Sequence, residues 1–399
     1  MLSETQLQRY AEVLLWGLRT ARRDRYKKGD IVMIRHHMAA VRLAELLHAR
    51  LLDLGLQPVI QLIPTPGMEK NLFERARSRQ LDFWPPGEDV LYQHLNGSIF
   101  LYAPESITHL SGIDPKKIAR HALSRKPLRD ILDRRDAQGL FGWTLCMLPT
   151  AELAKHAQMD LKTYSRQIAK ACRLNRDDPV GDWQEIYKQA QRIKKWLNSL
   201  SVESFRLESD RIDLTITPGL HRQWVGLSGH NIPSFELFTS PDWRGSEGIY
   251  FSNLPSYRSG NLVRDVRLEF KRGSVVKIQA AEGESFTKLQ LGMDRGANKI
   301  GEFSLTDKRF SKIDRFMANT LFDENFGGAH GNCHIALGSS YADTFAGDPA
   351  QLSRERKQEL GFNDSALHWD LVNTENKRVT AFLSGGGRQL IYENGLFAY

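Results

Sequence analysis

Two histidines and an aspartate near the end of the chain have the types and spacing of metal ligands. In His368-Trp-Asp370 an imidazole and a carboxylate stand two positions apart. Alternate residues of an extended strand project from the same face, so these two side chains can bind one cation together. His334 stands in a second apolar run, Cys333-His-Ile-Ala-Leu-Gly. Imidazole and carboxylate ligands together indicate a divalent metal site.

Three glutamates stand among large apolar residues. Glu236 lies in Phe235-Glu-Leu-Phe-Thr, Glu302 in Ile300-Gly-Glu-Phe, and Glu324 in Leu321-Phe-Asp-Glu-Asn-Phe. Burying a carboxylate is costly unless a cation or strong hydrogen-bond donors compensate. With His334, His368 and Asp370 they make a set of carboxylates and imidazoles that suffices for two divalent ions sharing bridging carboxylates.

Five motifs in order resemble the thermophilic aminopeptidase T and aminopeptidase S family of metalloaminopeptidases. They are Asn231-Ile-Pro-Ser-Phe-Glu-Leu-Phe-Thr-Ser-Pro, Ile300-Gly-Glu, Asn319-Thr-Leu-Phe-Asp-Glu-Asn, Cys333-His-Ile-Ala-Leu-Gly-Ser-Ser-Tyr and His368-Trp-Asp. These motifs are spread over residues 205–372. The N-terminal half is similar to the family only in its pattern of strands and helices.

The resemblance implies metal ligands at Glu236, Glu302, Glu324, His334, His368 and Asp370, and a catalytic tyrosine at Tyr341. It implies an intracellular homodimer with an enclosed active site, which removes N-terminal residues from peptides with two divalent ions, of zinc, cobalt, manganese or magnesium. Either Glu302 or Glu324 would accept the proton of the attacking water. Tyr341 would donate a hydrogen bond to the tetrahedral oxyanion.

The chain departs from the pattern of this family at two places. Ser234-Phe235 stands where a small or acidic pair usually precedes the first glutamate, and the insertion Gly327-Gly-Ala-His-Gly-Asn brings in His330, either another ligand or a loop residue. His334, His368 and Asp370 alone also match the two-histidine, one-carboxylate set of non-haem iron oxygenases. The alternative function is therefore a mononuclear iron dioxygenase of the dihydroxypyridine ring-cleaving type, although one iron does not require three glutamates.

The elements that position these residues differ between the two halves of the chain. Up to about residue 200, apolar runs at 31–35, 58–63, 98–103 and 141–148 alternate with helical periods at 40–54, 115–135, 151–172 and 183–200. This alternation predicts an α/β domain, residues 1–200, with a parallel sheet covered on both faces. Ser3 and Gln6 predict a capping box that begins an N-terminal helix.

Short alternating strands dominate after residue 200. They include 211–217 and a hairpin of 266–270 and 274–280 with its turn at Gly273, and helical periods return only at 284–293 and 315–326. Residues 201–399 are therefore predicted to form an α+β catalytic domain with a mostly antiparallel sheet.

Charge and cysteine content restrict the remaining functions. The net charge of +8 is uneven, with 32 basic and 22 acidic residues in 1–200 against 23 and 25 in 201–399. Acids stand beside the basic runs, as on a solvated helix face, so we expect no nucleic-acid partner. Three widely spaced cysteines exclude a disulfide framework and a thiolate zinc site, and no signal-peptide core precedes the first helix. We expect a cytoplasmic protein without a membrane segment.

Overall fold

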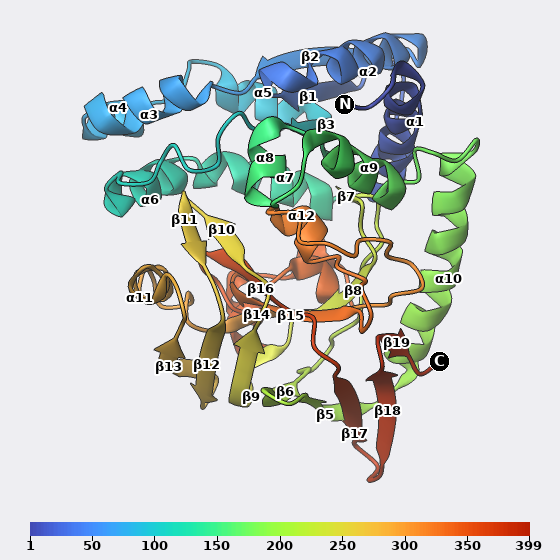
Figure 1. The fold of residues 1–399 in the computed structure, drawn as a ribbon, viewed down its shortest axis with the longest axis vertical. Helices are drawn as coiled ribbons and strands as arrows, with labels where there is room; N and C mark the ends of the chain where they lie inside the picture. Colours follow the sequence, from blue (N-terminus) through green and yellow to red (C-terminus); the bar gives the residue numbers. More distant parts are fainter. The chain divides into compact units, whose positions relative to one another are not determined.

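The computed structural model describes residues 1–399 and contains two compact units (Figure 1). The first consists of Met1–Trp183 and Ser228–Pro233, and the second of Gln184–Leu227 and Ser234–Tyr399. The domain boundary near residue 200 remains a prediction, and helix α10 (Pro179–Ser199) ends just before it. None of the helices combines the length and the apolar character that a membrane span requires.

A five-stranded sheet with only parallel pairings forms the centre of the first unit. Its order is β2-β1-β3-β4-β7. The strands are β1 (Ile31–His36), β2 (Gln57–Leu62), β3 (Leu95–Tyr102), β4 (Gly142–Met147) and β7 (Asn231–Ile232). The four longer strands are the predicted apolar runs, so the α/β architecture is confirmed. Strand β7 is an addition from later in the chain that the sequence did not reveal.

Several helices of the first unit begin at side-chain caps that the sequence carries. Ser3 forms the predicted capping box, in which its hydroxyl accepts from the backbone N–H of Gln6. The predicted helix at 115–135 is two helices because Pro127, which lacks an N–H, stands in the first turn of the second of them. Asp160 likewise caps a new helix inside 151–172. The helices are α1 (Glu4–Ala21), η1 (Met38–Ala40), α2 (Val41–Asp53), α3 (Pro66–Arg75), α4 (Ser78–Leu81), α5 (Glu88–His94), α6 (Pro115–Ser124), α7 (Lys126–Ala137), α8 (Ala151–His156) and α9 (Leu161–Ala171).

An eight-stranded antiparallel sheet is the larger of the sheets in the second unit. Its order is β13-β12-β9-β6-β5-β17-β18-β19. The predicted hairpin is β12 and β13, and its turn holds Gly273 at a φ of +77°. The strands are β5 (Val202–Glu208), β6 (Asp213–Thr217), β9 (Asp242–Ser252), β12 (Val266–Lys271), β13 (Ser274–Gln279), β17 (Arg378–Leu383), β18 (Arg388–Glu393) and β19 (Leu396–Phe397).

A second antiparallel sheet, ordered β16-β15-β14-β8, carries the candidate site. The buried hydroxyl of Tyr250 on β9 donates to the carbonyl of Leu371 at 2.7 Å and so links the two sheets. The strands are β8 (Glu236–Thr239), β14 (Ile300–Thr306), β15 (Asn332–Gly338) and β16 (His368–Asn373), and a small pair is β10 (Ser256–Arg258) with β11 (Asn261–Val263). The predicted mostly antiparallel α+β half is therefore confirmed.

Helices are short in the second unit. The predicted helical stretch at 315–326 is wrong in length, because only Thr320–Asp323 is helical. The backbone N–H groups of Met317 and Asn319 donate to the Asp323 carboxylate, and Ala318 between them has a left-handed φ of +51°. This clamp holds the segment out of a helix. Besides α10, the helices are α11 (Glu284–Leu291), α12 (Thr320–Asp323), η2 (Ala342–Thr344), η3 (Pro349–Gln351) and α13 (Arg354–Glu359).

Candidate metal centre

One face of the four-stranded sheet gathers most of the residues predicted to bind metal. In the antiparallel register, Ser304 lies opposite His334, while Ala336 lies opposite both Glu302 and Asp370. Directly opposed residues of antiparallel strands share a face, and so do residues two apart on one strand. Strands β14, β15 and β16 therefore present Glu302, His334, His368 and Asp370 on one side.

Two small residues make room on this face. Ala336 is the residue between Glu302 and Asp370 in the register, so the centre of the site has only a methyl group as its floor. Gly301 lies at a register shift between Ile300 and Glu302, where a Cβ would stand 2.4 Å from the carbonyl oxygen of Gly338. The Ile300-Gly-Glu motif thus combines a bulge, which only glycine allows here, with the carboxylate that the bulge directs.

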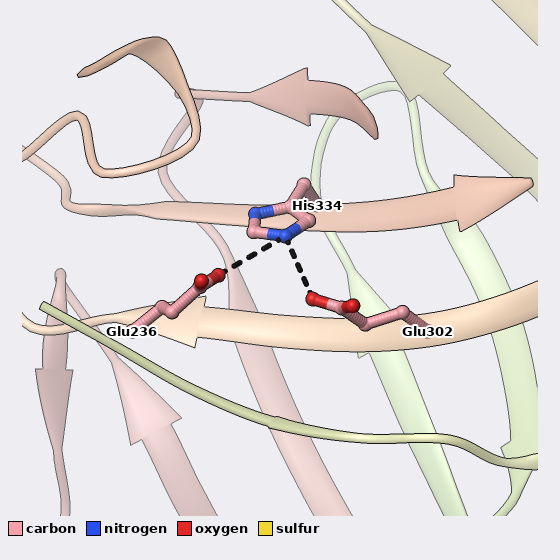
Figure 2. A group of neighbouring side chains, drawn as sticks. All are labelled: Glu236, Glu302 and His334. Carbon is pink, nitrogen blue, oxygen red and sulfur yellow. Dashed lines mark hydrogen bonds and ion pairs between the residues drawn. The ribbon is translucent and has the colours of Figure 1, made fainter. Parts of the chain in front are cut away.

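The imidazole of His334 is the centre of the cluster. Its Nε2 lies 3.2 Å from Glu236 Oε2, 3.2 Å from Glu302 Oε1 and 3.9 Å from Asp370 Oδ1. Figure 2 shows the Glu236 and Glu302 side chains converging on this nitrogen. The ligand atoms of these three residues lie within 4.8 Å of one another. Glu236, Glu302 and His334 are at most 6% exposed, so the cluster is shielded from water.

His368 extends the cluster along β16. Its Nε2 lies 3.5 Å from Asp370 Oδ1 and 3.6 Å from Glu302 Oε2. Glu302 therefore directs one oxygen at each imidazole. Nδ1 of His368 lies 3.0 Å from the carbonyl oxygen of Ser339, so Nδ1 carries a proton, and in the neutral ring Nε2 is the nitrogen that has a lone pair for a metal ion.

Glu324 and Tyr341 border the cluster from outside the sheet. Glu324 is buried at the end of α12, and the charges of Glu236, Asp370 and Glu302 all act on it. The Tyr341 ring meets the His368 ring edge-on, with 4.8 Å between their centroids. The structure thus brings all seven predicted site residues into one region of the second unit.

Several partners of the site were not predicted. The Ser304 hydroxyl donates to Glu236 Oε2 at 2.9 Å, and Asn325 Nδ2 lies 3.4 Å from Glu324 Oε1. Arg258 donates to the carbonyl of His368 at 2.9 Å. Ser304 could have been found, because it stands two residues after Glu302 on the same face of a strand. Arg258 carries no comparable signal in the sequence.

The two residues in which the chain departs from the family pattern lie in different surroundings. Phe235 is fully buried beside Glu236, and its N–H donates to Asn325 Oδ1 at 2.5 Å. His330 is exposed, and its carbonyl accepts from Lys377 at 3.3 Å. The imidazole of His330 is therefore part of a surface loop and not of the cluster.

Burial and crowding of like charges shift the pKa values in the cluster. Burial raises the pKa of Glu236 to about 7, and burial with the neighbouring carboxylates raises that of Glu324 well above its ordinary range. Burial opposes the charge on Asp370, but His368 outweighs it and lowers the pKa of Asp370 to about 2. Burial also opposes charge on the two histidines, but the carboxylates outweigh it and raise the pKa of each to about 9.

These residues fit divalent metal ions. Three buried glutamates and the partly buried Asp370 surround two imidazoles, and without a metal ion only protons can neutralise their negative charge. Nitrogen and oxygen donors suit zinc, cobalt and manganese. The Nδ1 atom of His334 is buried without a hydrogen-bond partner, so the polar contacts of the ring are those of Nε2 with the surrounding carboxylates. A cation at Nε2 would replace the proton that these carboxylates now hold there.

We expect the metal-free protein to lose stability as the pH rises from about 6.5 to about 9. In the folded chain the pKa values of His334 and His368 stand near 9 against an ordinary 6.5, so the folded state binds more protons than the unfolded state in this range. Stability falls with pH where that holds, here by about 3 kcal/mol for each histidine. Urea unfolding of chelator-treated protein at each pH measures it, and His368→Gln should flatten the slope. A free energy of unfolding that is constant or rises with pH would contradict the assignment.

Comparison with known proteins points to one family. The family described as thermophilic metalloprotease (M29) matches residues 3–397. Aminopeptidase AmpS of Bacillus subtilis is 29% identical over 323 residues, which are 76% of this chain and 77% of that protein. Aminopeptidase T of Thermus aquaticus is 30% identical over 240 residues, 57% of each chain.

A solved structure has the same fold. Wild-type AmpT from Thermus thermophilus superposes with a TM-score of 0.79 and 20% sequence identity, over 98% of this chain and 99% of that one. The dioxygenase alternative finds no support among these matches, because the relatives carry the names of aminopeptidases.

Proposed function

Since the chain belongs to the M29 family of thermophilic metalloproteases, and is therefore a peptide hydrolase, we propose that it removes N-terminal residues from peptides with two divalent metal ions. The observation that supports two ions is the position of Glu302, whose oxygens face two different imidazoles. A carboxylate in that position can bridge a pair of ions.

The proposed ligands divide around this bridge. His334 and Glu236 would hold one ion, and His368 and Asp370 the other, with Glu302 between them. Zinc, cobalt, manganese and magnesium are the candidate metals. When bound, such ions polarise the scissile carbonyl and lower the pKa of water at the site toward neutrality.

The side chains would then move protons and stabilise charge. We assign the proton transfer to Glu324, because it lies beside the cluster but outside the contacts that join Glu302 to the imidazoles. Glu324 would accept the proton of the attacking water and pass it to the leaving amine. Tyr341, whose ring contacts the His368 ring edge-on, would donate a hydrogen bond to the developing oxyanion.

We further propose that the enzyme acts as a cytoplasmic homodimer on peptides that have a free N-terminus. The basic surface of residues 1–200 would then serve as scaffold, dimer surface or cavity wall.

Metal removal tests the proposed function. Treatment with a chelator should abolish hydrolysis of a panel of aminoacyl chromogenic substrates, because the proposed ions supply both the polarised carbonyl and the reactive water. Re-addition of zinc, cobalt or manganese should restore the activity, with about two ions per chain by elemental analysis. Undiminished hydrolysis by protein freed of metal would overturn the proposal.

A further inference from the structure

A small pocket adjoins the cluster on the same face of the sheet. Asp370 and Val372, two residues apart on β16, both line it, so it opens on the side where the carboxylates and imidazoles gather. Pro255 and Ser256 close it from the strand β10 side, and Asn319 and Asp323 close it from α12. Its volume of about 20 Å³ is room for one water molecule or for a group of that size.

The polar lining of this pocket favours a cation. Asp323 and Asp370 line a space that Val372 and Pro255 wall with apolar surface, and because Asp323 already accepts two backbone N–H groups, Asp370 is the carboxylate left for a cation. Asp370 directs Oδ1 at the imidazoles of His334 and His368, so its other oxygen has lone pairs left for a second positive group. A neutral apolar group here would leave these acceptors unpaired.

Asn319 supplies an acceptor that nothing in the protein uses. Its Oδ1 is buried and has no hydrogen-bond partner. An asparagine at the start of a helix ordinarily accepts from the backbone two or three residues on, but here it makes no such bond. Asp323 instead accepts from the backbone N–H of Asn319 at 2.9 Å and of Met317 at 2.7 Å, which holds the backbone of Asn319 at the edge of the pocket that this residue lines.

We propose that this pocket binds the α-ammonium group of the peptide, with Asn319 Oδ1 and Asp370 as its acceptors and Asp323 as a positioning residue. An ammonium group has three donors and the size of a water molecule. In an N-terminal residue the amine and the scissile carbonyl are separated by a single Cα, so a pocket beside the cluster lies where the amine must bind. This inference rests on the proposed aminopeptidase function and names the residue that makes the enzyme specific for a free N-terminus.

Kinetics of Asn319→Leu and Asn319→Asp test this assignment. Leucine keeps the size and removes the acceptor, and aspartate keeps the acceptor. Asn319→Leu should raise KM for leucine 4-nitroanilide roughly 10-fold or more, with kcat and metal content retained. The inhibition constant of 4-methylpentanoyl 4-nitroanilide, which lacks the amine, should be unchanged. Asn319→Asp should stay close to the wild type, and Asn319→Ala replaces the leucine variant if that variant does not fold.

Binding of a simple amine gives a readout independent of turnover. 3-Methylbutylamine should raise the Tm of the metal-free wild type, and 3-methylbutan-1-ol should not, whereas Asn319→Leu should lose the response to the amine. Lys312→Ala, an exposed residue in the preceding loop, is the matched control. Equal KM values and equal amine responses in Asn319→Leu and the wild type would overturn the inference. The inference would also be overturned if potassium activated the wild type but not Asn319→Leu while both responded equally to the amine. The pocket would then bind an alkali ion. A wild type that hydrolyses no aminoacyl substrate would instead count against the proposed function.

Discussion

Replacing His334 with alanine is expected to remove both the bound metal and the peptidase activity. Nε2 of His334 contacts Glu236 and Glu302 at 3.2 Å, so its loss leaves buried carboxylates without their central nitrogen donor. Loss of a residue that only supports a ligand already costs 10–100-fold in metal affinity, so loss of this ligand should cost more than about 100-fold. Elemental analysis and hydrolysis of leucine 4-nitroanilide measure the two effects. Asp370→Ala should behave in the same way.

His330→Ala is the matched control for this experiment. His330 stands four positions before His334, but its side chain is exposed and only its backbone carbonyl makes contacts. The variant should keep wild-type metal content and activity. If His334→Ala is fully active and fully loaded with metal, the site is misassigned.

Conservative substitution of Glu302 and Glu324 should separate metal binding from proton transfer. Glu324→Gln keeps the shape of the side chain but cannot accept a proton, so kcat should fall by roughly 10²- to 10⁴-fold while the metal content stays near that of the wild type. Glu302→Gln should lower the metal content as well, because one of its two oxygens becomes an amide nitrogen that faces an imidazole. Metal titration beside steady-state kinetics distinguishes the variants.

Stability gives a second readout for the same pair. The pKa of Glu324 is raised by burial and by four neighbouring carboxylates, so the metal-free Glu324→Gln protein should be at least as stable as the wild type. Reversed metal contents, with Glu324→Gln depleted and Glu302→Gln loaded, would exchange the two assigned roles.

Local sequence patterns predicted most of the helices and strands. They failed where a side chain binds backbone groups that the predicted element would have used. Continuous apolar runs predicted β1 to β4, because a parallel sheet covered on both faces needs them. Strand β7 has only two residues, Asn231 and Ile232, and its pairing with β4 is a long-range contact that no periodicity reveals. The predicted helix at 315–326 fails because Asp323 accepts two backbone N–H groups that a helix would have used.

The candidate site was predictable in its residues but not in its arrangement. Carboxylates among phenylalanines and the spacing of His368 and Asp370 identify groups that need a cation. Glu302, and not Glu324, lies between the imidazoles. This position results from the strand order β16-β15-β14-β8 and from the bulge at Gly301, and both are properties of the folded sheet. Asn319 stood in one of the motifs, but only the folded structure shows that its Oδ1 is buried without a hydrogen-bond partner.

The order of strands in the site sheet constrains when the protein can acquire its metal during synthesis. Glu236 on β8 and Asp370 on β16 stand 134 positions apart, and β14 and β15 pair between them. A nascent chain still held by the ribosome at residue 330 has the glutamates but neither histidine. Loading should therefore follow release of nearly the whole polypeptide, and ribosome-bound chains truncated before His368 should carry no tightly held zinc.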